Sequence, residues 1–158
     1  MTINHNHYLN LAFHLAEKNL GKTKLNPSVG TVIVKNGAVL STGVTSFHGR
    51  PHSEFNALNN TTNCSGASLY TTLEPCTHFG KTPPCTNIIK KKRIKNVFYA
   101  FEDPDVRTFQ KAKKILSKNG IRTKLIRTKK YSKFYRSYFF NKKFSVPFVS
   151  AKIAISKD

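Results

Sequence analysis

Three residues of types that bind zinc lie within one stretch of this sequence, at spacings that suit a catalytic metal site. His52 comes first, and Cys76 and Cys85 follow it, with eight residues between the two cysteines. A catalytic zinc ion has three such protein ligands and keeps its fourth position for water. Bound zinc lowers the pKa of that water towards neutrality. These three residues are therefore the predicted ligands of one Zn²⁺ per chain, with a bound water or hydroxide.

Glu54 lies two residues after His52, close enough to act on that water without binding the metal. The order His-x-Glu, then Pro-Cys, then Cys is typical of zinc deaminases. In that chemistry the hydroxide attacks a ring carbon that bears an amino group. The glutamate passes a proton to the amino nitrogen, which leaves as ammonia. Glu54 is therefore the predicted catalytic residue.

A structural zinc site is the alternative interpretation of the same residues. The sequence has three cysteines and six histidines, so a His/Cys/Cys set is easily found by chance. A structural site normally has a fourth protein ligand, and Cys64 or His78 could supply it. The presence of Glu54, together with a proline before Cys76 and before Cys85, favours the catalytic interpretation.

The chain has the length and composition of one globular domain. It has 158 residues, of which 39% are hydrophobic. No apolar run approaches the roughly 18 residues that a membrane span needs, and the first residues do not resemble a signal peptide. Three cysteines is an odd number, and two are assigned to metal, which favours a reducing cytoplasm over a disulfide framework.

The net charge of +20 is unusual, since 27 Lys and Arg face only 7 Asp and Glu. One interpretation is an anionic partner, either nucleic acid or a phosphorylated substrate. The other is a compositional bias towards Lys and Asn on solvated faces. The wide scatter of the lysines favours the second interpretation and disfavours nucleic acid. A phosphate-bearing small molecule is compatible with both.

The elements that hold these residues alternate between helix and strand, which predicts an α/β fold with a mixed, mostly parallel sheet and helices on both faces. Asn36-Gly37 is a strong hairpin-turn signal. Helical spacing or strand-forming composition gives these ranges: helices at 4–20, 53–60, 85–92 and 108–119, a basic aromatic helix at 129–141, and strands at 31–35, 38–45, 67–73, 97–101, 121–126 and 147–156.

This order places the chemical residues at the ends of elements. His52 and Glu54 fall at a helix N-terminus, where the helix dipole favours an ionised glutamate. Cys85 begins the next helix, where the pKa of a thiol is lowered. Asp103 follows a central strand, at the edge where ligands of α/β sheets gather. Asn26 precedes a proline, so its residue type alone favours a turn over a ligand.

Four segments together resemble one family, the cytidine-deaminase-like superfamily, and within it the diaminohydroxyphosphoribosylaminopyrimidine deaminases of riboflavin biosynthesis. They occupy positions 26–30, 49–54, 73–85 and 103–105. The resemblance extends from Tyr8 to Ile126. It implies a three-layer fold with a mixed five-stranded sheet. Most deaminases of nucleotides and nucleic acids in this superfamily place two residues between the cysteines, whereas this chain and the riboflavin deaminases have a longer loop.

The resemblance implies a substrate and its contacts. Asn26, His78, Lys81 and Asp103 match substrate-binding positions of the family, with Lys81 suited to a phosphate. The implied reaction removes the 2-amino group of 2,5-diamino-6-ribosylamino-4(3H)-pyrimidinone 5′-phosphate. The chain departs from the family at Val44-Thr45, where many members have Tyr-His, and at 106–111, where glycines are usual.

Residues 1–145 are thus expected to form a zinc-dependent deaminase domain. Residues 146–158 resemble the start of a reductase domain that is absent, so we expect deamination without reductase activity. The segment 148–156 should lack its usual partners and be mobile or self-associating. A second copy of the chain and a separate reductase are the protein partners that the resemblance suggests. The alternative functions are a tRNA or other nucleic-acid base deaminase and a non-catalytic, truncated zinc-binding remnant.

Overall fold

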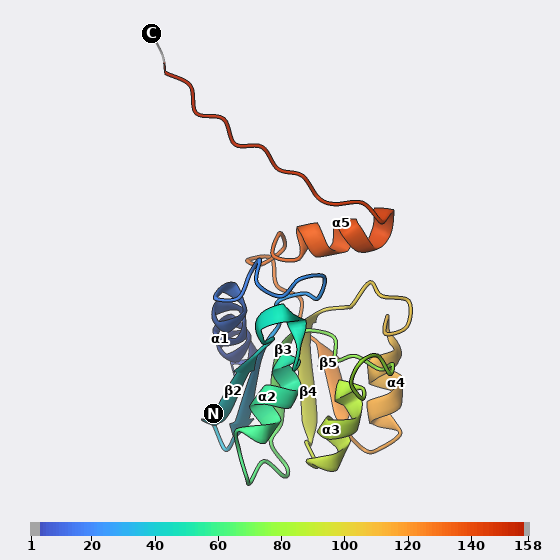
Figure 1. The fold of residues 1–158 in the computed structure, drawn as a ribbon. Coiled ribbons are helices and arrows are strands. Elements are labelled where there is room, and N and C mark those ends of the chain that lie inside the picture. The colour runs from blue at the N-terminus through green and yellow to red at the C-terminus, as the bar shows by residue number, and fades with distance from the viewer. Residues whose placement is uncertain (1–3, 157–158) are drawn as a thin grey trace.

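A five-stranded sheet forms the centre of the protein, in a computed structural model that describes residues 4–156 (Figure 1). The strand order is β2-β1-β3-β4-β5. The strands have these bounds: β1 Gly30–Lys35, β2 Ala38–Val44, β3 Ser68–Leu73, β4 Asn96–Phe101 and β5 Arg122–Leu125. The five strands lie where the sequence predicts them, within about two residues at each end, as expected for such boundaries.

The sheet is mixed as predicted, but the expectation of a mostly parallel sheet is wrong. β1 pairs antiparallel with both β2 and β3, and only the β3–β4 and β4–β5 pairs are parallel. The reason lies in the hairpin, which makes β2 run opposite to β1. After α2 the chain returns on the other side of β1, again in the opposite direction.

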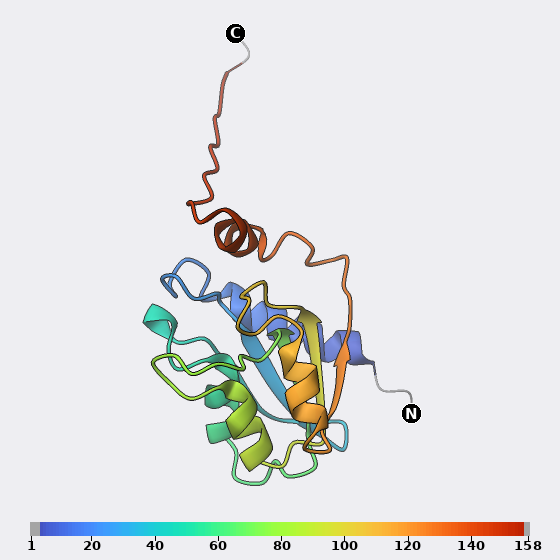
Figure 2. The same cartoon turned by 90° about the vertical axis from the view of Figure 1, so that its right-hand side faces the viewer.

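Helices cover both faces of the sheet. α1 (His5–Glu17) packs on one face, while the opposite face carries α2 (Ser53–Asn59), α3 (Cys85–Lys91) and α4 (Lys111–Ser117) (Figure 2). The strands alternate between the two resulting cores. In β3, for example, Leu69 joins the core under α2 to α4, and Tyr70 joins the core under α1.

Two local sequence features, the Asn36-Gly37 turn and Gly43, explain how β1, β2 and α2 are arranged. Asn36 and Gly37 both have positive φ, as the tight hairpin between β1 and β2 requires. Gly43 in β2 faces α2, and a Cβ there would collide with the Ser53 carbonyl and the Ala57 nitrogen. The glycine therefore lets the N-terminal turn of α2 lie directly against the sheet.

The last helix, α5 (Arg136–Phe144), lies across the end of the sheet at which β3 and β4 terminate (Figure 1). The sequence predicts a basic aromatic helix at 129–141, whereas α5 begins at Arg136 and ends at Phe144. Tyr135, just before α5, is buried and donates a hydrogen bond to the Ser28 carbonyl at 3.0 Å, and its hydroxyl lies 2.6 Å from that of Thr72. These long-range contacts fix where the helix begins.

The predicted strand at 147–156 is wrong, because residues 146–156 have no regular secondary structure and lead away from the sheet (Figures 1 and 2). A strand needs a neighbouring strand to satisfy its backbone groups, and this segment pairs with none of the five. Its apolar side chains include Val149, Ile153 and Ile155, all exposed. Residues 157 and 158 lie outside the described part. Among residues 4–156, no helix is long and apolar enough to cross a membrane.

Candidate metal centre and substrate cavity

The three predicted zinc ligands come from three different elements and meet at one point. His52 is the residue before α2, Cys76 follows β3, and Cys85 is the first residue of α3. The His52 Nδ1 atom lies 3.6 Å from Cys76 Sγ and 3.4 Å from Cys85 Sγ. All three ligand atoms lie within 4.8 Å of one another.

This geometry fits a tetrahedral zinc ion. Zinc–sulfur and zinc–nitrogen bonds of about 2.3 and 2.0 Å place such ligand atoms roughly 3.6 Å apart. The Cys85 backbone N–H also donates to Cys76 Sγ at 3.2 Å. Hydrogen bonding from the Cys85 side chain lowers the pKa of Cys76 to about 4, so a thiolate forms readily. The lowered pKa expected for Cys85 at its helix N-terminus is wrong, because its hydrogen bond to Cys76 and its burial raise the pKa of this thiol. Cys76 is thus the cysteine that forms a thiolate first, and zinc binding would have to displace the proton of Cys85.

Neither candidate for a fourth protein ligand belongs to this cluster. Cys64 is buried in the core under α2 to α4, and its thiol points to the Lys92 carbonyl 3.9 Å away. His78 Nδ1 lies 3.1 Å from the Thr108 hydroxyl. Within residues 4–156, the His52 cluster is the one group of three or more ligand-type side chains close enough to share a metal ion. The arrangement therefore corresponds to the open, catalytic type of site.

Glu54 lies beside the cluster in the first turn of α2, with only 4% of its surface exposed. Ser53 Oγ donates to Glu54 Oε2 at 3.2 Å and lies 2.8 Å from the Thr31 hydroxyl in β1. Burial raises the pKa of Glu54. A carboxylate with a raised pKa is suited to accept and return a proton near neutral pH.

A cavity of about 260 Å³ opens in front of the cluster. Glu54 lines it together with all four residues assigned to the substrate, which are Asn26, His78, Lys81 and Asp103. Asn26 was expected to be either a turn residue or a substrate ligand, and the structure is compatible with both. Its side chain holds a loop and also lines the cavity. Its Nδ2 donates to the Gly49 carbonyl at 2.9 Å.

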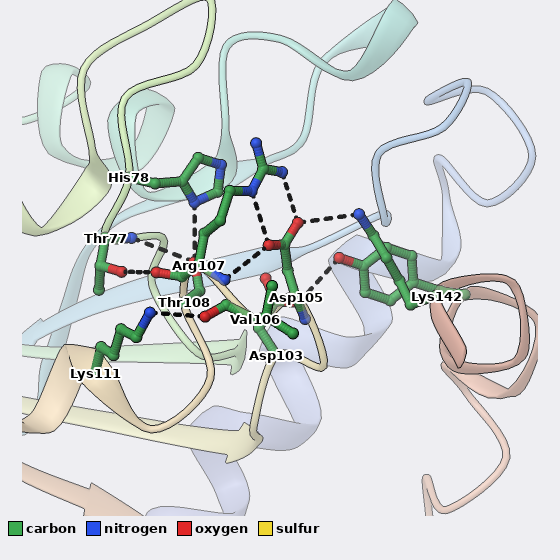
Figure 3. Close-up of polar contacts among 10 residues, drawn as sticks. Thr77, His78, Asp103, Asp105, Val106, Arg107, Thr108, Lys111 and Lys142 are labelled. Carbon is green, nitrogen blue, oxygen red and sulfur yellow. Dashed lines mark hydrogen bonds and ion pairs between the residues drawn. The ribbon is translucent and has the colours of Figure 1, made fainter. Parts of the chain in front are cut away.

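Two loops on the cavity wall are tied to each other (Figure 3). The loop between the cysteines contributes Thr77, whose hydroxyl donates to the Arg107 carbonyl at 2.8 Å. It also contributes His78, which contacts Thr108. Thr108 belongs to the loop that follows β4. The residues directly after Cys76 are therefore held against the loop that follows β4.

Asp103 is fixed by two donors on one oxygen. Tyr138 of α5 donates to Asp103 Oδ1 at 3.0 Å, and the Asp105 backbone N–H donates to the same atom at 3.0 Å. Burial raises the pKa of Asp103, which is only 7% exposed. The aspartate is thus held in one orientation at the cavity wall by a helix from the end of the chain.

Sequence reasoning missed several residues that line the cavity. The buried Glu74 accepts hydrogen bonds from the backbone N–H groups of Asp103, Gln110 and Ala112, at 3.0 to 3.3 Å. It thereby fastens the loop after β4 to the end of β3. Its position beside Pro75 and Cys76 was a signal that sequence analysis could have used. The cavity is also lined by Arg50, Asp105, Arg107, Tyr138 and Lys142. Nothing local in the sequence indicates that α5 reaches the site.

Comparison with known proteins places these features in a family. Residues 2–101 match the model of the cytidine and deoxycytidylate deaminase zinc-binding region. The chain is 38% identical over 154 residues to riboflavin biosynthesis protein RibD of Bacillus amyloliquefaciens, covering 96% of this chain and 42% of the relative. It is 39% identical over 136 residues to diaminohydroxyphosphoribosylamino-pyrimidine deaminase of Buchnera aphidicola subsp. Schizaphis graminum, covering 85% and 92%. The chain thus spans less than half of the Bacillus protein but nearly all of the Buchnera protein.

A solved structure shares the fold. Acinetobacter baumannii RibD superposes with a TM-score of 0.85 at 33% identity, over 91% of this chain and 41% of the other. A Thermotoga maritima protein, described as a diaminohydroxyphosphoribosylaminopyrimidine deaminase and 5-amino-6-(5-phosphoribosylamino)uracil reductase, superposes with a TM-score of 0.75 at 32% identity, over 87% and 40%. These matches confirm the predicted three-layer fold.

Proposed function

The chain belongs to the family of cytidine and deoxycytidylate deaminase zinc-binding proteins, and we propose that it deaminates 2,5-diamino-6-ribosylamino-4(3H)-pyrimidinone 5′-phosphate. The products are 5-amino-6-ribosylamino-2,4-pyrimidinedione 5′-phosphate and ammonia. The observation that carries this proposal is the shared cavity. A zinc-type ligand set, a buried glutamate and the four substrate-type residues all face one space. The Buchnera relative, named for this deamination, supports the choice of substrate.

His52, Cys76 and Cys85 would hold the zinc ion. Bound zinc supplies an acidified water as the nucleophile. Glu54 takes the first proton of the attacking water to the ring nitrogen and the second to the departing amino nitrogen, so that the carbon keeps the oxygen as a carbonyl and ammonia leaves. Its burial keeps competing solvent away from the carboxylate. Ser53 steadies one of its oxygens and leaves the other for this transfer.

The substrate is oriented by side chains with matching hydrogen-bonding groups. Asn26 and Asp103 offer acceptors to the ring and ribose, since Asn26 Nδ2 and Asp103 Oδ1 are already engaged with the protein. His78 and Lys81 come from the loop between the cysteines, and Lys81 contributes a cation for the phosphate. With these roles, one bound substrate molecule can make all four predicted contacts.

The domain organisation that we propose has a deaminase domain at 1–145 and a tail at 146–158. Residues 146–156, the described part of this tail, do not join the sheet and do not line the cavity. We propose that residues 1–145 catalyse the deamination and do not reduce its product. NADPH oxidation by the purified protein in the presence of the deaminated product would contradict this. The cytoplasm is the compartment that we propose, because the three cysteines are free.

Ammonia release from the diaminopyrimidine ribotide tests the function. The zinc-loaded protein should release ammonia, and Glu54→Gln should lower kcat by about 10² to 10⁴-fold, as expected for a lost acid–base group. Zinc content should be equal in both proteins. If both proteins bind zinc but neither acts on the ribotide, on tRNA or on single-stranded DNA, the result supports the remnant interpretation. Deamination of tRNA or single-stranded DNA instead would support the nucleic-acid alternative.

A further inference from the structure

Charge is unevenly distributed over the substrate cavity. Two of its carboxylates, Glu54 and Glu74, are deeply buried, with 4% and 2% of their surface exposed. The cations lie at the outside. We call them the cationic rim, and they are Arg50, Lys81, Arg107 and Lys142. The cavity therefore has an acidic floor and a basic entrance, which suits a molecule with hydrogen-bond donors at one end and an anion at the other.

Two members of the cationic rim share one carboxylate. Arg107 binds Asp105 through two hydrogen bonds, with Nε 2.8 Å from Oδ1 and Nη2 2.6 Å from Oδ2. Lys142 Nζ lies 3.0 Å from the same Oδ2. Figure 3 shows the two cations reaching Asp105 from opposite sides. The nearby Asp103 carboxylate is bound to Tyr138 and to the Asp105 N–H, so Asp105 is the carboxylate with which both cations form ion pairs.

Asp105 is a fixed anchor for these cations. Its side chain is 9% exposed, whereas those of Arg107 and Lys142 are 57% and 31% exposed. Its backbone N–H donates to Asp103, which links the anchor to the predicted substrate residue. The cations are thus held in place before any ligand arrives, while most of their N–H groups stay available. Such preorganised cations match the oxygens of a phosphate monoester.

We propose that Arg107 and Lys142, anchored by Asp105, bind the phosphate of the substrate and that α5 thereby determines specificity for the phosphorylated compound. This inference rests on the proposed function and adds two residues to it. α5 has no buried residues and lies at the periphery, yet it contributes Lys142 to the phosphate and Tyr138 to Asp103. The helix therefore forms one wall of the substrate site.

The test compares Lys142→Met with Lys143→Met. Both lysines lie on α5, but Lys143 contacts the Phe144 ring and does not line the cavity. The kinetic measurement is kcat/KM for the diaminopyrimidine ribotide and for its dephosphorylated riboside. Lys142→Met should lower kcat/KM for the ribotide about tenfold more than kcat/KM for the riboside, because one charge-assisted hydrogen bond to the phosphate is lost. Lys143→Met should change neither rate constant by more than twofold.

A binding measurement separates this inference from the proposed reaction. Calorimetric titration of the zinc-loaded protein with ribose 5-phosphate, and with ribose as the control, needs no catalysis. If binding of ribose 5-phosphate weakens in Lys142→Met alone but no ammonia is released by the wild type, the phosphate site stands and the proposed reaction fails. Equal effects of the two methionine variants would overturn the inference. So would a Lys142 effect on single-stranded RNA binding without an effect on ribose 5-phosphate.

Discussion

The zinc centre and the cationic rim differ in how their side chains are held. At the zinc centre, His52, Cys76 and Cys85 come from the starts or ends of regular elements and contact one another directly. At the rim, Arg107 lies in a loop and Lys142 on a peripheral helix, and both are exposed. Chemistry thus depends on short-range packing around α2 and α3, while substrate selection depends on contacts between loops and the end of the chain.

The two regions can be held differently because the displacement of a side chain has different consequences in each. A displaced proton-transfer group loses most of its catalytic effect, because the reacting atoms must be aligned closely. An exposed cation that binds phosphate tolerates small shifts, because the attraction between charges falls slowly with distance. Changes at the zinc centre should therefore abolish the reaction, whereas changes at the rim should alter only substrate affinity. Three predictions probe this comparison.

Loss of a zinc ligand should have the largest effect. Cys76→Ala removes one of three ligands, so the protein should retain no zinc. Its ammonia release should fall by more than the roughly 10–100-fold that the loss of an outer-shell partner costs. Cys64→Ala is the matched control, because this buried cysteine lies outside the cluster. Metal content by atomic absorption and the ammonia assay measure both effects. Stoichiometric zinc in Cys76→Ala would show that the three residues are not the metal site.

Glu74→Gln should have an intermediate effect, because Glu74 connects the two regions. Its oxygens accept three backbone N–H groups from the loop after β4 and the start of α4. A glutamine must turn its NH₂ group towards one of these donors, which costs about 1–3 kcal/mol of unfolding free energy. The loop that carries Asp103 should loosen, so KM should rise several-fold with a smaller change in kcat.

The control for Glu74 is Glu102→Gln, an identical change nearby. Glu102 accepts one hydrogen bond, from the Gln110 side chain at 3.0 Å, and its loss should change the unfolding free energy by less than about 0.5 kcal/mol. Thermal unfolding and steady-state kinetics provide the measurements. If Glu74→Gln lost zinc while KM stayed the same, the loop after β4 would belong to the metal centre, and the division into two regions would be wrong.

The pH-dependent stability that Asp105 contributes at the rim should be the smallest of the three effects. Hydrogen bonding from Arg107, followed by that from Lys142, holds the pKa of Asp105 well below its usual range. A carboxylate with a lowered pKa stabilises the fold above its unfolded pKa of about 3.9, and the contribution is lost as the pH falls. Asp105→Asn should therefore be less stable than wild type at pH 5, and the difference should shrink towards pH 2.

The partners of Asp105 limit the size of that effect. Arg107 and Lys142 are exposed to solvent, so salt should reduce the difference at pH 5. Asp103 and Tyr138 face the same region, and both are present in the two proteins compared. Denaturant unfolding at several pH values measures the difference directly. A difference that stays constant from pH 5 to pH 2 would mean that Asp105 acts through packing and not through its charge.

The sequence predicts the members of the zinc centre, because residue type and the short motif around each member are local signals. His52 and Glu54 are two residues apart, and the start of α2 fixes their relative positions. The Asn36-Gly37 turn likewise requires only the positive φ of two neighbouring residues. Asn26 and Asp103 could be assigned only through the resemblance to a family, since each residue type is equally common in turns.

Other features could not be predicted because they depend on long-range contacts. The apolar pattern at 147–156 is typical of a strand, but no neighbouring strand pairs with that segment. Likewise, the basic and aromatic composition of α5 predicts a helix but not the surface it covers. Tyr135 settles its position by reaching Ser28 and Thr72, more than sixty residues away in the chain.

The sequence by itself thus predicted the three metal-binding side chains that the structure brings together, the proton-transfer residue that we propose, and the alternating elements that hold them. These follow from residue type and short spacing, which fix local geometry. Only the tertiary structure decided that Glu74 fastens the loop after β4, and that Tyr138 and Lys142 complete the cavity wall. The reason is that a packing direction depends on contacts between distant segments, and no short pattern encodes those contacts.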